Sequence, residues 1–403
     1  MEASSQPSPA RRIGALVFLL VGYFFYAWSW NTVDILRPYF RADFGLTLGQ
    51  TGALYSLQAI GGICGAIILG QVADVIGRRN TLVIAMLGYG SILAAGVFLQ
   101  SYSELVAQRV AMGFFMGAMY PVAVGIYSSL FPRSVRGLIA GIALAVYNLG
   151  VAALGFCSAA AFRSGLHWHT LLWAGVIPAA LALLAFVFIP DDRRLKPVDT
   201  IVEVDATPKA RFPIAELFRP AVARQTILLA LMSGLNLFAY QVFTGWASIY
   251  LKSERSFDDA IVGDILGWQF AGAALGGLLW GWLSDRFGRR TGSIGFLIAA
   301  SIIPVYLFAP FPVALVKLVG FLYGTMLSAS AIWGPWLSEL YPPHLRSTAA
   351  SIYNWGRGLS MVAPLVTAPL AEAFGLGPVM VIASGCFLLA ALIWRTLPET
   401  IQL

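Results

Sequence analysis

The strongest constraint on this chain is a series of long apolar segments, each of the length that a membrane-spanning helix requires. A helix needs about 20 consecutive apolar residues to cross the hydrocarbon core of a bilayer. Twelve segments bounded by charged residues, Gly and Pro meet this requirement. We predict an all-α polytopic membrane protein with twelve transmembrane helices, at residues 13–39, 51–71, 81–100, 104–127, 137–162, 170–189, 225–251, 260–281, 292–310, 313–338, 347–370 and 376–396.

The positions of the basic residues orient these helices. Only 11% of the residues are charged, against about 25% in soluble domains, yet the net charge is +7. With the spans in place, 18 of the 26 Lys and Arg residues fall on one side of the membrane and five on the other. An excess of positive charge marks the cytoplasmic side. We therefore expect a multi-pass protein of the cell inner (plasma) membrane with both termini cytoplasmic, and no nucleic-acid partner.

One connection between spans is long and polar, and it divides the chain into two sets of six helices. We predict an N-terminal six-helix bundle at residues 1–190, a cytoplasmic central loop at 191–223 and a C-terminal six-helix bundle at 224–403.

Two motifs recur between these halves at the same offset. The segment 70–79 (GQVADVIGRR) reappears as 281–290 (GWLSDRFGRR), and 131–136 (FPRSVR) reappears as 341–346 (YPPHLR), at offsets of 211 and 210 residues. Two pseudo-symmetric six-helix bundles of this kind are typical of transporters, in which substrate binds near the midplane and the halves rock around it.

The repeated G-x-x-x-D-x-x-G-R-R loop resembles the signature of the major facilitator superfamily, and the resemblance extends over the whole chain. Arg109-x-x-x-Gly113-x-x-x-Gly117, the 339–346 segment (ELYPPHLR) and the terminal 397–400 segment (LPET) resemble the branch with sugar porters, aromatic-acid/proton symporters and lactate and sialate symporters. The resemblance implies the major facilitator fold and a transporter that moves its substrate by alternating access.

Other positions distinguish the members of that branch. Sugar porters carry P-E-S-P-R where this chain has 189–192 (IPDD), whereas 353–358 (YNWGRG) is closest to the lactate and sialate symporters. Monocarboxylate members carry a series of polar residues in the seventh span, and of these only Asn236 is present here. In the first span, Ser29 and Thr32 occupy the positions at which the aromatic-acid branch has two Asp residues. Both nearest families imply an organic-acid symporter, from which this chain departs at substrate-facing positions.

Arg357 is the most informative single residue, because its position in the eleventh span is about 15 Å deep. A buried guanidinium there suits a bidentate carboxylate ligand; the alternative is a fixed pair with Asp34 or Asp264. Aromatic and amide side chains within the spans favour a flat ligand with a polar end, and core packing is the alternative for each. The predicted substrate-binding residues are Arg357, Asn354, Tyr353, Trp355, Tyr147, Asn148, Asn236, Tyr240, Gln269, Trp333, Gln58 and Trp28.

We predict Asp34 and Arg109 as proton-coupling residues. Asp34 is the only acid within the first span, and a partly desolvated carboxylate can load and release protons; the alternative is an interfacial acid paired with Arg37. Arg109 lies beside the small residues Gly113 and Gly117, so a packing or gating role is equally open. Asp264 could serve a helix N-terminus, and Lys317 could extend to the membrane surface.

The repeated loops are predicted to gate the cytoplasmic side, since their glycines permit tight turns and their charges can bind helix ends. Ser129 replaces the acid that would correspond to Glu339, so we expect an asymmetric network. The predicted gating residues are Asp74, Gly77, Arg78, Arg136, Asp285, Gly288, Arg289, Glu339 and Arg346.

Nucleotide-binding and hydrolase motifs do not occur in the sequence, and its three cysteines show no metal or redox spacing. We expect no enzyme activity, no metal and no cofactor, with a proton gradient as the energy source. The leading hypothesis is a monomeric proton symporter that takes up a small organic anion, such as a monocarboxylate or aromatic acid. The alternatives are a proton-coupled exporter of amphipathic compounds, a sugar or polyol porter, and a non-transporting sensor.

Overall fold

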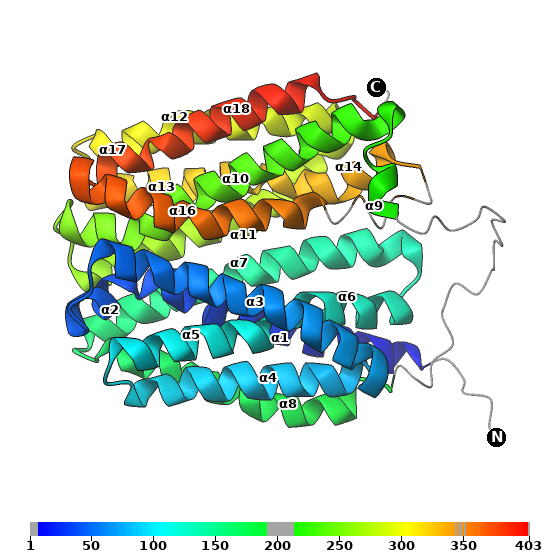
Figure 1. Ribbon diagram of the computed structural model, residues 1–403, viewed down its shortest axis with the longest axis horizontal. Helices are drawn as coiled ribbons and strands as arrows, with labels where there is room; N and C mark the ends of the chain where they lie inside the picture. The colour runs from blue at the N-terminus through cyan, green and yellow to red at the C-terminus, as the bar shows by residue number, and fades with distance from the viewer. Residues whose placement is uncertain (1–6, 192–212, 343–344, 346–348, 350–351, 402–403) are drawn as a thin grey trace. The chain divides into compact units, whose positions relative to one another are not determined.

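The computed structural model describes residues 7–191, 213–342, 345, 349 and 352–401. The chain forms two compact units, Met1–Glu203 (unit 1) and Val204–Leu403 (unit 2). Both units are helical bundles, and the described residues contain no strand (Figure 1).

Unit 1 contains six spans, some built from two helical pieces. Its elements are α1 (Pro9–Ile35), α2 (Arg37–Asp43), α3 (Leu48–Ile76), α4 (Arg78–Ala95), η1 (Gly96–Phe98), α5 (Tyr102–Gly117), α6 (Met119–Leu130), α7 (Arg133–Arg163), η2 (Trp168–Gly175) and α8 (Val176–Phe188).

Unit 2 follows the same order after a short first helix. Its elements are α9 (Pro213–Glu216), α10 (Pro220–Ser253), α11 (Asp259–Phe287), η4 (Arg289–Thr291), α12 (Gly292–Phe308), α13 (Val313–Leu327), η5 (Ser328–Ile332), α14 (Trp333–Leu340), α16 (Ile352–Phe374), α17 (Leu376–Met380) and α18 (Ile382–Thr396).

Eleven helical segments within the described residues are long and apolar enough to cross a membrane. The remaining predicted span corresponds to α16, which has 23 residues but carries Trp355 and Arg357 in its first two turns. A helix with polar side chains at this depth has to face protein or water rather than lipid.

The sequence repeat is also a repeat of backbone geometry. Helices α3 and α11 have the same length and lie 211 residues apart. Each ends at a glycine with φ of +91°, Gly77 in unit 1 and Gly288 in unit 2. A side chain is strained in this left-handed conformation, so the glycine allows the chain to turn directly into the next helix.

Close contact between helix backbones forms the centre of each unit. In unit 1, α3 packs along α5, and a Cβ atom at Gly65 or Gly113 would overlap the backbone of the other helix. Helices α11 and α13 form the same kind of seam in unit 2, at Gly272 and Gly324. Small residues at such seams let membrane helices gain van der Waals contact along their whole length.

Several spans predicted as single continuous helices are broken in the structure. The predicted 13–39 helix ends at Ile35 and is followed by α2, the 104–127 helix breaks at Ala118, and the 313–338 helix changes to a 3₁₀ turn at Ser328. Changes between 3₁₀ and α geometry or a single turn residue also divide the 81–100, 170–189 and 376–396 spans. Pro38, Pro121 and Pro335 lie in the first turns of α2, α6 and α14. Proline lacks an N–H group, so it is tolerated at the start of a helical segment rather than in its interior.

Pro304 is an interior exception, and the structure contains a compensating group. Its missing N–H would have bonded the carbonyl of Ala300. The hydroxyl of Ser384 on α18 donates to this carbonyl at 2.6 Å instead. Helix α12 therefore contains an interior proline without leaving this carbonyl unsatisfied within the membrane.

Candidate functional site

The strongest candidate site in unit 1 is a buried group of charges where α1 meets α2. An Nη2 atom of Arg37 lies 2.5 Å from a carboxylate oxygen of Asp34, and the two side chains are 0% and 6% exposed. Arg37 begins α2, so the break after Ile35 sets the geometry of this pair. The alternative of an Asp34–Arg37 pair is confirmed, but the pair is buried rather than interfacial.

Arg109 adds a second buried guanidinium to this group. It lies on α5, donates to the hydroxyl of Thr32 at 2.8 Å, and its central carbon lies 4.8 Å from the ring centroid of Phe40. Asp34 also interacts electrostatically with Arg109. Within the described residues, the Nε and Nη2 atoms of Arg109 have no hydrogen-bond partner.

Two guanidinium groups and one carboxylate give this cluster an excess of positive charge. Burial of a charge costs several kcal/mol, of the order of 3 to 5 when its partner is missing. Ionisable groups inside membrane helices are therefore rare and usually functional. The cluster combines both residues predicted for proton coupling, Asp34 and Arg109, and their role remains a prediction.

A face of aromatic and amide side chains lies beside this cluster on α1 and α7. Tyr26 packs against Trp30 and against Tyr147, with ring centroids 6.2 and 5.9 Å apart. Asn31 donates to the Tyr147 hydroxyl at 3.0 Å, and Gln58 donates to the Trp30 carbonyl at 3.0 Å. Of the predicted substrate-binding residues, the structure therefore brings Tyr147 and Gln58 to this face.

Asn31 and Tyr26 were not among the predicted site residues. Asn31 is an amide within a span, like Gln58, and Tyr26 precedes Trp30 by about one helical turn. A search for amides within spans and for aromatic residues one helical turn apart would have identified both residues. Two predicted residues lie elsewhere: Trp28 is buried and donates to the Leu171 carbonyl at 3.3 Å, and Asn148 donates to a carbonyl of its own helix at 3.1 Å.

Unit 2 buries amides and hydroxyls where unit 1 buries charges. Gln269 is 1% exposed and lies 3.4 Å from the Thr244 hydroxyl, which in turn lies 3.4 Å from the Tyr323 hydroxyl. Asn236 is also buried, whereas Tyr240 is half-buried. These contacts place Gln269 and Thr244 in the interior of the bundle.

The remaining predicted substrate-binding residues of unit 2 are spread over several environments. Trp333 is 3% exposed and packs in a cluster of aromatic rings with Phe296 and Trp394. Arg357 is exposed on α16, and Trp355 stacks on Phe218 with the ring planes 7° apart. Tyr353 and Asn354 belong to α16, but their side chains lie outside the described set.

The acids named as alternative partners of Arg357 both have other cations beside them. Asp34 contacts Arg37, and Asp264 lies 3.1 Å from the ammonium of Lys317. Lys317 is therefore held within the bundle, and Asp264 pairs with it rather than only serving the helix N-terminus.

The repeated loop of unit 2 forms a dense charged network. Arg289 contacts Asp285 at 2.7 Å and Glu339 at 2.6 Å. Glu399, near the C-terminus, accepts from the backbone N–H groups of Arg289 and Arg290 at 2.8 and 2.9 Å. These contacts connect three segments that are distant in the sequence, the repeated loop, the end of α14 and the region near the C-terminus.

The charges of this network shift the acidity of its carboxyl groups. Burial raises the pKa of Glu339, but hydrogen bonds from Arg289 and Thr400 and the charge of Arg289 outweigh it, so the pKa lies below the ordinary 4.5. Burial likewise raises the pKa of Glu399, and backbone hydrogen bonds from Arg290 and Arg289 bring it below 4.5. Both groups are held in their ionised form.

Unit 1 has a different arrangement at the equivalent positions. Arg78 donates to the Gly125 carbonyl at 2.9 Å, and Ser129, which replaces the acid, donates to its own helix. Arg136 donates to the carbonyls of Ser128 and Phe131 at 2.6 and 2.9 Å. The expected asymmetry is confirmed.

The remaining residues of the repeated loops lie in different surroundings. Asp74 is exposed at the end of α3, and Arg79 lies 3.6 Å from Asp191. Arg346 lies outside the described residues. The gating role of all these side chains remains a prediction.

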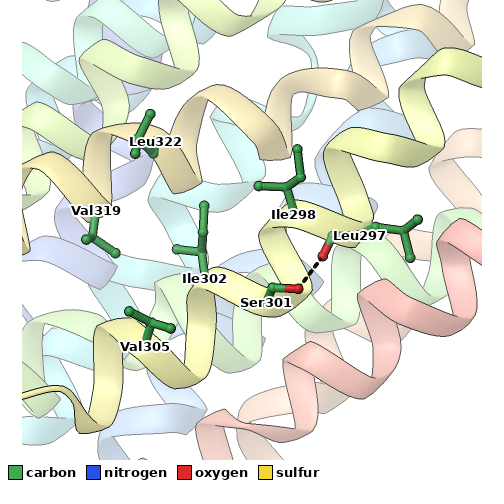
Figure 2. A pocket seen from close by; sticks show the side chains of 7 residues that line it. All are labelled: Leu297, Ile298, Ser301, Ile302, Val305, Val319 and Leu322. Atoms are coloured by element: carbon green, nitrogen blue, oxygen red, sulfur yellow. Dashed lines mark hydrogen bonds between the residues drawn. The ribbon is translucent and has the colours of Figure 1, made fainter.

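The described residues also bear on a metal site and on an apolar groove. No group of three or more His, Cys, Asp or Glu side chains there could hold a metal ion. An apolar groove of about 370 Å³ lies between α12 and α13, and its hydroxyl, Ser301, donates to the Leu297 carbonyl at 3.0 Å (Figure 2). That hydroxyl is satisfied, so this groove suits hydrocarbon rather than a polar substrate.

Two repeated six-helix bundles with charged residues inside the membrane helices define a secondary transporter. The sequence model of the Major Facilitator Superfamily matches residues 19–258 and 229–401. The chain belongs to this superfamily and is a transporter rather than an enzyme, with the twelve-helix all-α fold that the sequence predicts.

Similar curated proteins carry small organic compounds. The probable 4-methylmuconolactone transporter of Cupriavidus pinatubonensis is 26% identical over 93% of this chain and 88% of its own. The cis,cis-muconate transport protein of Acinetobacter baylyi is 27% identical over 88% and 86%. The 4-hydroxybenzoate transporter of the same organism is 28% identical over 68% and 65%.

A solved structure supports the fold. A bacterial homologue of the human lysosomal transporter Spinster, inward-facing and unoccupied, matches with a TM-score of 0.80 over 97% of each chain, at 15% identity.

Proposed function

We propose that this transporter takes up a small organic anion, an aromatic acid or a monocarboxylate, together with protons. The observation that carries the proposal is its similarity over most of the chain to transporters named for muconate and 4-hydroxybenzoate. Both compounds are carboxylates with flat, conjugated carbon skeletons. An aromatic and amide surface such as that of Tyr26, Trp30, Asn31 and Tyr147 suits such a skeleton.

Arg357 is the proposed partner of the substrate carboxylate. A guanidinium offers two parallel N–H donors to a carboxylate, and this geometry favours an acid over a neutral sugar. Its exposed side chain on the polar part of α16 supports access to a ligand.

Asp34 is the proposed proton carrier. The Arg37 guanidinium stabilises the ionised carboxylate, so a proton can load only when this contact opens. Within the described residues the Nε and Nη2 atoms of Arg109 have no hydrogen-bond partner, and Arg109 and Asp34 interact electrostatically, so Arg109 is the proposed cation that compensates the carboxylate when Arg37 moves away. Proton binding would then be coupled to a change in the position of α2.

The membrane orientation belongs to the same proposal. The excess of Lys and Arg on the side of the termini places both ends of the chain in the cytoplasm of an inner (plasma) membrane. Protons then enter from the opposite side, near α2, and drive uptake by a monomer without a cofactor.

The test is uptake into proteoliposomes with an imposed pH gradient. Labelled 4-hydroxybenzoate, muconate, lactate and glucose are compared for the wild type, Arg357→Gln and Arg357→Lys. We expect uptake of an acid that requires an inward proton gradient, is lost in Arg357→Gln and is partly retained in Arg357→Lys. Glucose uptake would favour a sugar porter, and acid uptake that is insensitive to Arg357 would contradict the anion site. Proton-driven efflux of amphipathic dyes without acid uptake would identify an exporter.

A further inference from the structure

A second group of titratable side chains lies at the end of unit 1 far from Pro9, where α2 meets η2 (Figure 1). The Nδ1 atoms of His167 and His169 are 2.6 Å apart. The Nε2 atom of His167 lies 3.2 Å from Asp43, and the indole of Trp168 donates to the same carboxylate oxygen at 2.6 Å. His169 lies in η2, and His167 directly precedes this segment.

The hydrogen-bond pattern limits how many protons this pair can hold. A contact between two Nδ1 atoms requires one N–H donor and one bare nitrogen. His167 uses its Nε2–H toward Asp43, so in the neutral pair its Nδ1 accepts and the Nδ1–H of His169 donates. The Nε2 atom of His169 is then bare, which agrees with its burial without a hydrogen-bond partner among the described residues. A fully protonated pair would direct two N–H groups at each other and cannot keep this contact.

The surrounding charges modulate proton binding to the pair. Asp43 attracts a proton, and a positive charge on His167 opposes a proton on His169. Helix α8 and the η1 turn pack against η2 and contribute no charged residue, and α4 carries its two arginines at its other end. The charged groups at this end of the surrounding elements are Asp43, Arg41 and Arg37 on α2, Arg163 on α7, and Asp34 on α1, whereas Arg11 and Arg12 on α1 and Arg133 and Arg136 on α7 lie at the other ends of their helices.

Packing connects the histidine pair to the buried charges. Trp168 stacks on His169 at 3.7 Å and meets the edge of Phe40 at 4.9 Å between ring centroids. Phe40 in turn lies under the guanidinium of Arg109. Helix α2 thus carries Arg37, Phe40 and Asp43 at intervals of three residues, so one short helix contacts both groups.

We propose that His167, His169 and Asp43 form a second proton-binding site, distinct from Asp34, whose state is carried by α2 to the Asp34–Arg37 pair. One proton lies between the two Nδ1 atoms. A second proton at this contact separates the rings, and the separation releases Asp43 and α2 from the pair. The proposal rests on the proposed function only in the consequence for transport, which is a shift in the external pH at which uptake is fastest. The site itself and its effect on α2 can be measured without any substrate.

The first experiment is an NMR titration of the full-length protein with labelled histidine in nanodiscs. The chain contains only three histidines, so His344→Gln assigns the third signal. We expect the pair to titrate in two steps more than about one pH unit apart, as strongly interacting sites do. In His169→Gln, and separately in His169→Asn in case one variant folds poorly, His167 should titrate in one step. Two independent single-step titrations in the wild type would overturn the proposal.

The second experiment measures hydrogen exchange of the α2 amides at pH 5 and pH 7.5. Protection of residues 37–43 should fall at the lower pH in the wild type, by about tenfold in exchange rate, and stay constant in His167→Gln. Equal loss of protection in both proteins would show that α2 does not respond to the pair and would overturn the coupling. If the proteoliposomes carry no organic acid, the proposed function fails while these two measurements still decide the proton site.

Discussion

In unit 1 a group of buried charges lies at the junction of α1 and α2, whereas in unit 2 an ionic network joins the repeated loop to Glu399 near the C-terminus. The two backbones follow one plan, with α3 and α11 of equal length and the same glycine turn after each. At the offset of 211 residues, Asp34 corresponds to Gly245 and Arg37 to Ser248, while Ser129 corresponds to Glu339 at 210. The duplicated fold therefore carries a buried Asp–Arg cluster in one copy and an ionic network around Arg289 in the other.

The largest expected effect comes from Asp34→Asn, which would leave two buried guanidinium groups without their carboxylate. Loss of one partner of a buried pair costs about 3 to 5 kcal/mol, and proton-driven uptake should disappear. Thermal unfolding in detergent and proteoliposome uptake measure the two effects. The matched control is Asp264→Asn in unit 2, where the Lys317 side chain is 28% exposed and can reach water. Equal destabilisation by both variants would contradict the special position of the unit 1 cluster.

Next in size is the difference between Arg289→Ala and Arg78→Ala. Arg289 binds two carboxylates, whereas Arg78 donates to a backbone carbonyl. We expect initial uptake rates to fall about tenfold for Arg289→Ala and about twofold for Arg78→Ala, because only the loss of Arg289 removes a cation that binds both Asp285 and Glu339. Rates are normalised to reconstituted protein. A larger loss of uptake rate in Arg78→Ala than in Arg289→Ala would contradict the assignment of the stronger ionic network to unit 2.

The ionic network of unit 2 should also be more sensitive to acid than the repeated loop of unit 1. The pKa of Glu339 and of Glu399 is held below 4.5 in the folded protein. Their contribution to stability is therefore complete above about pH 4.5 and is lost as the pH falls through the lower folded values. Thermal unfolding between pH 6 and pH 3 should show that Glu339→Gln lowers the melting temperature at pH 6 and has little effect at pH 3. A constant difference across this range would exclude the ionic explanation.

The smallest expected effect concerns the interior proline of α12, Pro304. Ser384→Ala removes the donor to the Ala300 carbonyl and should destabilise unit 2 by about 1 kcal/mol. Pro304→Ala restores the helical N–H, so the double variant should recover most of the loss. Helix α4 of unit 1 contains no proline and needs no such donor. Unfolding of both single variants and the double variant measures the coupling, and simple additivity would show that the hydroxyl is not compensating for the proline.

Most of the fold was predictable because it depends on length and repetition. Apolar segments of membrane-spanning length, the polar loop and the two repeated motifs indicated the two bundles and the superfamily. The breaks at Ala118 and Ser328 were missed, since an apolar segment has the same composition whether or not it bends there.

The candidate site was predictable only in part. The Asp34–Arg37 pair follows from a three-residue spacing, but the approach of Arg109 depends on how α5 packs against α1. Trp333 and Gln269 lie in the interior of unit 2, although their positions within spans suggested a substrate face. Spans that are apolar on every side give little information about rotation, so composition could not tell which aromatic residues face inward.

The glycine seams have a mechanical consequence. Where α3 lies against α5, and α11 against α13, the backbones interlock so closely that neither helix can slide past the other. Both seams end at a break in the second helix, Ala118 in unit 1 and Ser328 in unit 2. Each bundle thus contains a closely packed pair of helices, followed by a break and a short helix. We expect α6 and α14 to change their angle at these breaks while the packed pairs keep their geometry. In a transporter built in this way, the ends of the bundles that carry α6 and α14 would move by bending of two short helices.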